Sequence, residues 1–169
     1  MGFFKGFHSS ERDAKKTKLN LQKSKKEMER VMREMRAKID TIQLNITRTN
    51  EEILKQQELA DKFTRYEERT EQSNEKRRFQ VQKEAALQEV EKLQQQKYDL
   101  EASMVPYQKS YDRMSHTFKE TFDRLDALQR EAASKGKESD VIKYITAEEE
   151  KVEFELAEAE ALLELRSEK

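Results

Sequence analysis

The side chains that could support catalysis or metal binding are spread along the chain without the spacing that either chemistry needs. The two histidines, His8 and His116, are far apart, and neither has a second histidine one helical turn away. The sequence contains no cysteine, no glycine-rich phosphate loop and no nucleophile-elbow serine. Neighbouring carboxylates such as Glu67 and Glu68 are common, but 41% of all residues are charged, so we interpret them as solvated helix faces. We therefore expect no enzymatic activity, no cofactor and no metal.

The apolar residues instead follow heptad spacing in two long series. The first consists of Leu21, Met28, Met32, Met35, Ile39, Ile42, Ile46, Thr49, Ile53, Gln56, Ala60 and Phe63. The second consists of Phe79, Lys83, Ala86, Val90, Leu93, Lys97, Leu100, Met104, Tyr107, Tyr111, Met114, Phe118, Thr121, Leu125, Leu128 and Ala132. Only Lys83, Lys97 and Thr121 break the apolar character of this second series. A spacing that averages about 3.5 residues forms a narrow seam, which a helix buries against another helix. With 34% hydrophobic residues and one proline, the composition is typical of long solvated helices.

These series predict an all-α fold built on a long antiparallel coiled-coil hairpin over residues 10–135. The first arm is expected at about Glu11 to Glu68. The tip is expected near residues 69–76, where apolar residues almost vanish and Ser73 and Asn74 favour a reversal. A single continuous rod is the alternative, because no glycine or proline marks the turn.

Proline interrupts the second series once, at Pro106. Because Tyr107 and Tyr111 stay in phase, we expect the helix to continue with a kink, and a true break is the alternative. Gly136 can end the hairpin.

Residues 136–169 are then expected to form a short helix plus an acidic C-terminal helix. The short segment covers Val141 to Ile145, and Thr146 with Glu149 has capping-box spacing that predicts the start of the last helix. We expect this helix to pack across the hairpin of a neighbouring copy. The residues predicted to make that contact are Val152, Phe154, Leu156, Leu162 and Leu163. Apolar residues outside the hairpin seam are further candidates for contacts between subunits: Val31, Leu44, Leu54, Leu59, Val81, Leu87 and Phe122.

The start of the chain, residues 1–9, combines aromatic and basic residues. A helical turn here would place three phenylalanines on one side, where they could enter a lipid head-group layer. Packing of the same rings on a neighbouring helix end is the alternative. The predicted membrane-binding residues are Phe3, Phe4, Phe7, Lys5, Lys15, Lys16 and Lys18. No apolar run approaches the roughly 20 residues that a bilayer-spanning helix needs.

Charge is divided unevenly along the chain. Residues 1–38 carry 12 basic and 5 acidic side chains, whereas residues 137–169 carry 5 basic and 11 acidic ones. Opposite charge at the two ends favours attraction between subunits or separate partners for each end. The lysines suit anionic lipids, whereas nucleic acid is disfavoured because no aromatic stacking positions or known binding motif accompany them.

Three stretches carry a family resemblance. They are Met1 to Phe7 (MGFFKGF), Arg30 to Arg36 (RVMREMR) and Ala147 to Leu162 (AEEEKVEFELAEAEAL). Together with the order of the expected elements, they resemble the family of bacterial phage-shock protein A and the plastid vesicle-inducing protein, the bacterial relatives of ESCRT-III. The chain departs from that family in its shorter apolar start and in lacking an Asp-Pro step before the first hairpin arm.

The resemblance implies a cytoplasmic protein, peripheral on the inner face of the membrane, that polymerises to maintain or remodel membranes. Its implied partners are further copies of itself, anionic lipids and a regulatory protein. From the residues alone, the competing hypothesis is a coiled-coil scaffold or adaptor that binds another protein through the acidic helix without membrane contact.

Overall fold

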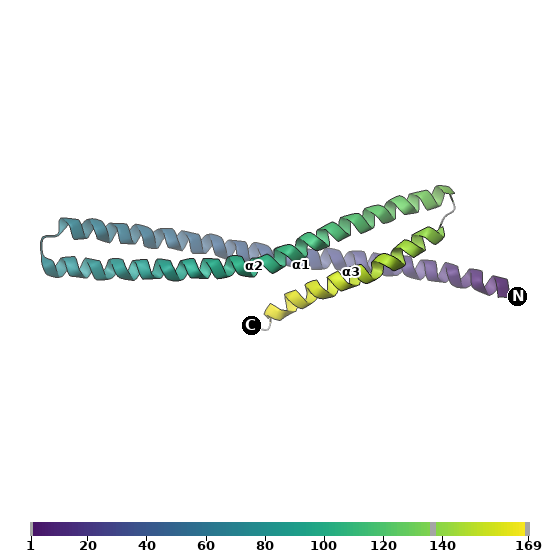
Figure 1. The fold of residues 1–169 in the computed structure, drawn as a ribbon, viewed down its shortest axis with the longest axis horizontal. Helices are drawn as coiled ribbons and strands as arrows, with labels where there is room; N and C mark the ends of the chain where they lie inside the picture. The colour runs from purple at the N-terminus through teal and green to yellow at the C-terminus, as the bar shows by residue number, and fades with distance from the viewer. Residues whose placement is uncertain (1, 136–137, 168–169) are drawn as a thin grey trace. The chain divides into compact units, whose positions relative to one another are not determined.

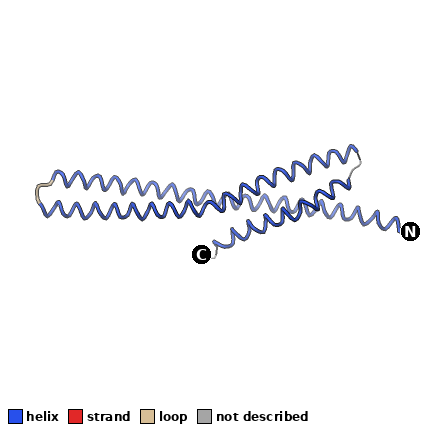
Figure 2. Tube along the Cα trace, viewed as in Figure 1, coloured by secondary structure: helices blue, strands red, loops and turns tan. Residues whose placement is uncertain are grey.

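The structure is a computed structural model that describes the backbone of residues 2–135 and 138–167 and the side chains of residues 22–134 and 139–165. These residues form three α-helices, α1 (Gly2–Arg69), α2 (Ser73–Lys135) and α3 (Glu138–Ser167), with no strand among them (Figures 1 and 2). The predicted all-α class is confirmed.

The reversal between α1 and α2 confirms the hairpin and excludes the continuous rod. The two helices are joined by residues 70–72, inside the predicted tip. The Thr70 hydroxyl donates to the Tyr66 carbonyl at 2.8 Å, which ties the end of α1 to the turn. The Gln72 carbonyl accepts the Lys76 N–H at 3.1 Å and so begins the hydrogen bonding of α2. Ser73 is the first residue of α2 and not the point of reversal.

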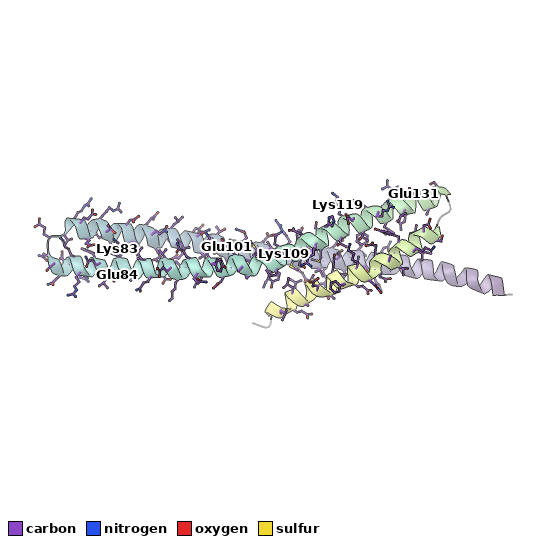
Figure 3. The ribbon with its side chains drawn as sticks, in the orientation of Figure 1. Lys83, Glu84, Glu101, Lys109, Lys119 and Glu131 are labelled. Atoms are coloured by element: carbon purple, nitrogen blue, oxygen red, sulfur yellow. The ribbon has the colours of Figure 1, made fainter. Side chains whose placement is uncertain are left out.

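The chain divides into two compact units, each with its own core. Unit 2 (Lys38–Pro106) contains the hairpin tip, and unit 1 contains the described residues up to Ala37 and from Tyr107 onward. The core of unit 2 consists of seam residues only: Ile39, Ile42, Ile46, Ile53, Ala60, Ala86, Val90 and Leu93. Polar residues at Thr49, Gln56, Lys83 and Lys97 are half-buried in the same seam. Figure 3 shows charged side chains projecting from α2, among them Glu84 and Glu101. Unit 2 is therefore a thin two-helix coiled coil.

Unit 1 contains three packed segments, from α1, α2 and α3. Their shared core is broader than that of unit 2 and includes residues outside the heptad seam. Its buried members are Met28, Val31, Met35, Tyr107, Met114, Thr117, Thr121, Phe122, Leu125, Ala132, Val141, Ile145, Val152, Leu156 and Ala159. The third helix thus supplies apolar contacts that the two hairpin arms do not make with each other.

Two element boundaries differ from the sequence prediction. Helix α1 begins at Gly2 and not at Glu11, so residues 2–9 are no separate segment. Helix α2 continues through Pro106, as predicted. The predicted start of the last helix at Thr146 is wrong, because one helix runs from Glu138 to Ser167. The Thr146 hydroxyl does not cap a helix start, since it donates to the Ile142 carbonyl four residues earlier at 2.9 Å.

Candidate assembly and membrane-contacting surfaces

The predicted membrane-binding residues all lie in the first part of α1. The backbone of Phe3, Phe4 and Phe7 is helical, and the helix is continuous with the hairpin arm. The side chains of all seven predicted residues, up to Lys18, lie outside the described side chains. Their contact with lipid therefore stays a prediction.

The five predicted assembly residues of α3 divide into two groups. Val152 and Leu156 are buried, with Val152 only 1% exposed, because they pack inside unit 1 of their own chain. For these two residues the structure replaces the predicted contact with a neighbour by a contact within the chain. Leu162 and Leu163 are half-buried. Phe154 is 70% exposed and faces solvent.

Hydrogen bonds between buried groups hold α3 in place on α2. The Thr117 hydroxyl donates to Oε1 of Glu155 at 2.7 Å, and the Thr121 hydroxyl donates to Oε2 of Glu148 at 3.4 Å. Both threonines are buried. The Oε2 atom of Glu155 is buried and has no hydrogen-bond partner, so the carboxylate depends on Thr117. Heptad spacing marked Thr121 only as a break in the apolar series, because its partner is 27 residues away.

A charged cluster around Arg30 joins α3 to α1. Arg30 donates hydrogen bonds to Glu27, to Glu34 at 2.7 Å and to Glu160 at 2.9 Å. The hydrogen bond from Arg30 lowers the pKa of Glu27 below its ordinary value, whereas burial, together with the neighbouring Glu27, raises the pKa of Glu160. Each exposed ion pair contributes little to stability. The cluster therefore fixes where α3 lies along α1 more than it strengthens the packing of α3. Two of the three stretches that carry the family resemblance thus contact each other in unit 1.

An open apolar cleft of about 310 Å³ lies between α1 and α2 in unit 1. Its lining residues are Glu29, Met32, Arg33, Arg36, Tyr111 and Phe118. Consecutive residues of a helix are about 100° apart around its axis. Phe118 and Tyr111, which line the cleft, lie about 100° and 120° around α2 from Thr117, which contacts α3. The cleft and α3 consequently occupy different sides of the helix pair.

Cations cover the aromatic rings beside this cleft. Nζ of Lys25 lies 5.9 Å from the centroid of the Phe118 ring and 5.5 Å from that of Phe122. The Arg36 guanidinium lies 5.8 Å from the centroid of the Tyr111 ring. A cation within about 6 Å of a ring centroid is attracted to the face of the ring. The cleft therefore combines an apolar floor with a basic rim, which the heptad pattern alone did not predict.

The apolar residues outside the seam, which were predicted to contact other subunits, include both buried and exposed side chains. Val31 and Phe122 are buried in unit 1, so they belong to the core of their own chain and the prediction that they contact another subunit is corrected. The other five are exposed: Leu44, Leu54, Leu59, Val81 and Leu87. Tyr98 adds a further exposed ring on unit 2, at 67%. Large apolar side chains therefore remain uncovered on the hairpin.

Acidic side chains are numerous among the described residues. Within them, no group of three or more acidic or histidine side chains is arranged to hold a metal ion. No helix in that part of the chain has an apolar stretch long enough to cross a bilayer.

Comparison with known proteins returns no match of any kind. No protein-family model matches the chain. No curated protein and no solved structure matches it either.

Proposed function

We propose that this chain is a non-enzymatic peripheral membrane protein that binds anionic lipids through the start of α1 and self-assembles to maintain or remodel membranes. The proposed location is the cytoplasmic face of the inner membrane, with a regulatory protein as a further partner. The observation that carries the proposal is the continuity of α1 from Gly2 to Arg69. The aromatic and basic residues of the predicted membrane segment belong to the same helix as the hairpin arm. The resemblance to the phage-shock protein A family supports the same function.

Helix continuity makes lipid contact by so short a segment energetically reasonable. An isolated helix of seven or eight residues is unstable in water, because nucleation costs more than the few hydrogen bonds return. As the first turns of a 68-residue helix, residues 2–9 need no separate nucleation. Burying three phenylalanine side chains contributes several kcal/mol, at roughly 25 cal/mol per Å² of apolar area. Nearby lysines add about 1 kcal/mol each at an anionic surface.

Uncovered apolar residues support the self-assembly part of the proposal. Single exposed apolar side chains are normal on a protein surface. Here, however, they occur on both units of a chain in which 41% of residues are charged, including Leu54 and Val81 on unit 2 and Phe154 on α3. Association with further copies would remove them from water.

Vesicle flotation tests the membrane contact. The intact chain is mixed with phosphatidylcholine vesicles that do or do not contain phosphatidylglycerol. We expect flotation with the anionic vesicles only. The triple variant Phe3→Ser, Phe4→Ser, Phe7→Ser should stay at the bottom of the gradient, whereas the control Tyr98→Ser, which removes an exposed ring from unit 2, should float. Equal flotation of the intact chain and the triple variant would rule out a role for the phenylalanines in lipid binding.

The adaptor hypothesis is the second candidate, favoured by the acidity of α3. Residues 138–167 contain ten acidic and three basic side chains. An adaptor of this kind forms a small, defined oligomer and binds a basic partner protein without lipid. Negative-stain microscopy of the full chain with anionic vesicles separates the two hypotheses, because membrane remodelling predicts large regular particles on the vesicles. Small particles with unaltered vesicles would favour the adaptor.

A further inference from the structure

The outward side of α3 carries an apolar stripe that its own chain leaves uncovered. Phe154 and Leu165 are 70% and 69% exposed. Their separation of 11 residues is about three turns, so they share one side of the helix. Val152 lies two residues from Phe154, about 200° around the axis, and faces the core of unit 1. The inward side of α3 is thus occupied and the outward side is free of the core.

Acidic residues flank the most exposed ring of this stripe. Glu150 and Glu158 lie one turn before and one turn after Phe154, and both are exposed. Glu158 forms a long ion pair with Arg113, at 3.9 Å. The outward side of α3 therefore presents an aromatic ring between two carboxylates, with the exposed Lys151 one turn before the ring.

The cleft between α1 and α2 has the complementary character. Its floor consists of the half-buried side chains Met32, Tyr111 and Phe118, and its rim combines the exposed Arg33 and Arg36 with the half-buried Glu29, so the arginines are in excess. A methionine floor adapts readily to a partner ring, because the thioether chain is flexible and sulfur contacts aromatic rings favourably. Arginine on the rim suits a carboxylate that arrives beside an apolar group.

We propose that the cleft of one copy receives Phe154 of a second copy, with Glu150 and Glu158 of that copy lying against the arginine rim. The inference rests on the proposed self-assembly and names the surface through which it occurs. Charge complementarity between the acidic outward side of α3 and the basic rim selects a second copy as the occupant.

The positions of the two surfaces determine how such contacts accumulate. The cleft and α3 lie on different sides of unit 1, so one copy uses both surfaces with two different neighbours. Contacts between two different patches are heterologous and form rings or open chains of copies. A series of copies then forms without any change in the packing of α3 on its own unit.

Disulfide trapping tests the contact directly, because the sequence contains no cysteine. Two variants, Met32→Cys and Phe154→Cys, are mixed with phosphatidylglycerol vesicles under mild oxidation. The contact brings the two thiols together, so the mixture should yield about tenfold more covalent dimer than either variant alone. The matched control mixes Met32→Cys with Tyr98→Cys, an equally exposed position on unit 2, and should stay at the background level.

A second measurement separates failure of the contact from failure of self-assembly. Phe154→Ser alters an exposed position, so it should leave folding intact while weakening association about thirtyfold, the effect of losing one buried aromatic side chain. Tyr98→Ser is its control. Trapping no greater than the control, with large particles still seen by light scattering, would overturn the contact and leave self-assembly standing. Absence of particles from the unaltered chain would overturn both.

Discussion

Replacing Thr117 by valine tests how α3 is held in unit 1. The substitution keeps the shape of the side chain but removes the hydroxyl that donates to Glu155 at 2.7 Å. The second oxygen of Glu155 is already buried without a partner, so the substitution removes the hydrogen bond on which this half-buried carboxylate depends. A hydrogen bond to a charged group contributes about 1.5–3 kcal/mol, so we expect α3 to be held about 2 kcal/mol less tightly.

Hydrogen exchange measured by mass spectrometry detects the weaker packing of α3 as faster exchange of the backbone amides in peptides from this helix. Loss of about 2 kcal/mol corresponds to exchange roughly thirtyfold faster for the amides of α3. Peptides from unit 2, such as those covering residues 46–60, should exchange at the unaltered rate. Thr47→Val is the matched control, because the exposed Thr47 hydroxyl donates only to the Gln43 carbonyl of its own helix.

A double substitution distinguishes the hydrogen bond from simple loss of packing. Replacing both partners of a buried hydrogen bond by apolar groups of similar shape is nearly neutral, because no polar group is left unpaired. The variant Thr117→Val, Glu155→Leu should therefore restore much of the protection that Thr117→Val alone removes. Our reasoning is refuted if Thr117→Val leaves α3 exchange unchanged, or if the second substitution adds a further loss of similar size.

Three other perturbations probe the remaining contacts. Ile53→Ala should lower the free energy of unfolding of unit 2 by about 2–4 kcal/mol in urea titrations, because Ile53 packs with Val90 and Leu93; an equal loss from the exposed Leu54→Ala would contradict this. Lys97→Leu should raise the urea midpoint of unit 2 by placing an apolar residue in the seam, with about 1 kcal/mol gained, and a lowered midpoint would argue against burial of that position. The pKa of Glu160 is raised above its ordinary value of 4.5 by burial, so its contribution to stability is present below pH 4.5 and is lost as pH rises through the raised pKa. Glu160→Gln should accordingly slow α3 exchange at pH 7 relative to the unaltered chain and have little effect at pH 4, whereas faster exchange at pH 7 would show that the Arg30 contact dominates.

The hairpin could be predicted from sequence because heptad spacing is a local property that the finished fold preserves. Every buried residue of unit 2 belongs to one of the two heptad series. The turn was placed within a few residues because apolar residues almost vanish there. The length of α1 was underestimated, since the first heptad series begins only at Leu21 whereas the helix begins at Gly2.

The arrangement of α3 could not be predicted in the same way. The capping-box spacing at Thr146 is a local signal, and it was outweighed by long-range packing. Val141 and Ile145 are buried in phase with Val152, so one uninterrupted helix covers more apolar surface than two shorter ones. Arg30 is 130 residues from its partner Glu160 in the sequence, and Thr117 is 38 residues from its partner Glu155. Heptad spacing relates only residues that are close in sequence, so it could not predict these contacts.

The two cores differ in composition. This difference explains why α3 packs on unit 1, while several apolar side chains of unit 2 stay exposed. Unit 1 places Thr117 and Thr121 where α3 supplies carboxylates, so these two buried hydroxyls are paired by the third helix. Unit 2 has no such third segment, and its seam includes Lys83 and Lys97 in place of apolar residues. A two-helix coil of that kind buries little apolar area for its length, because each polar seam residue removes one contact.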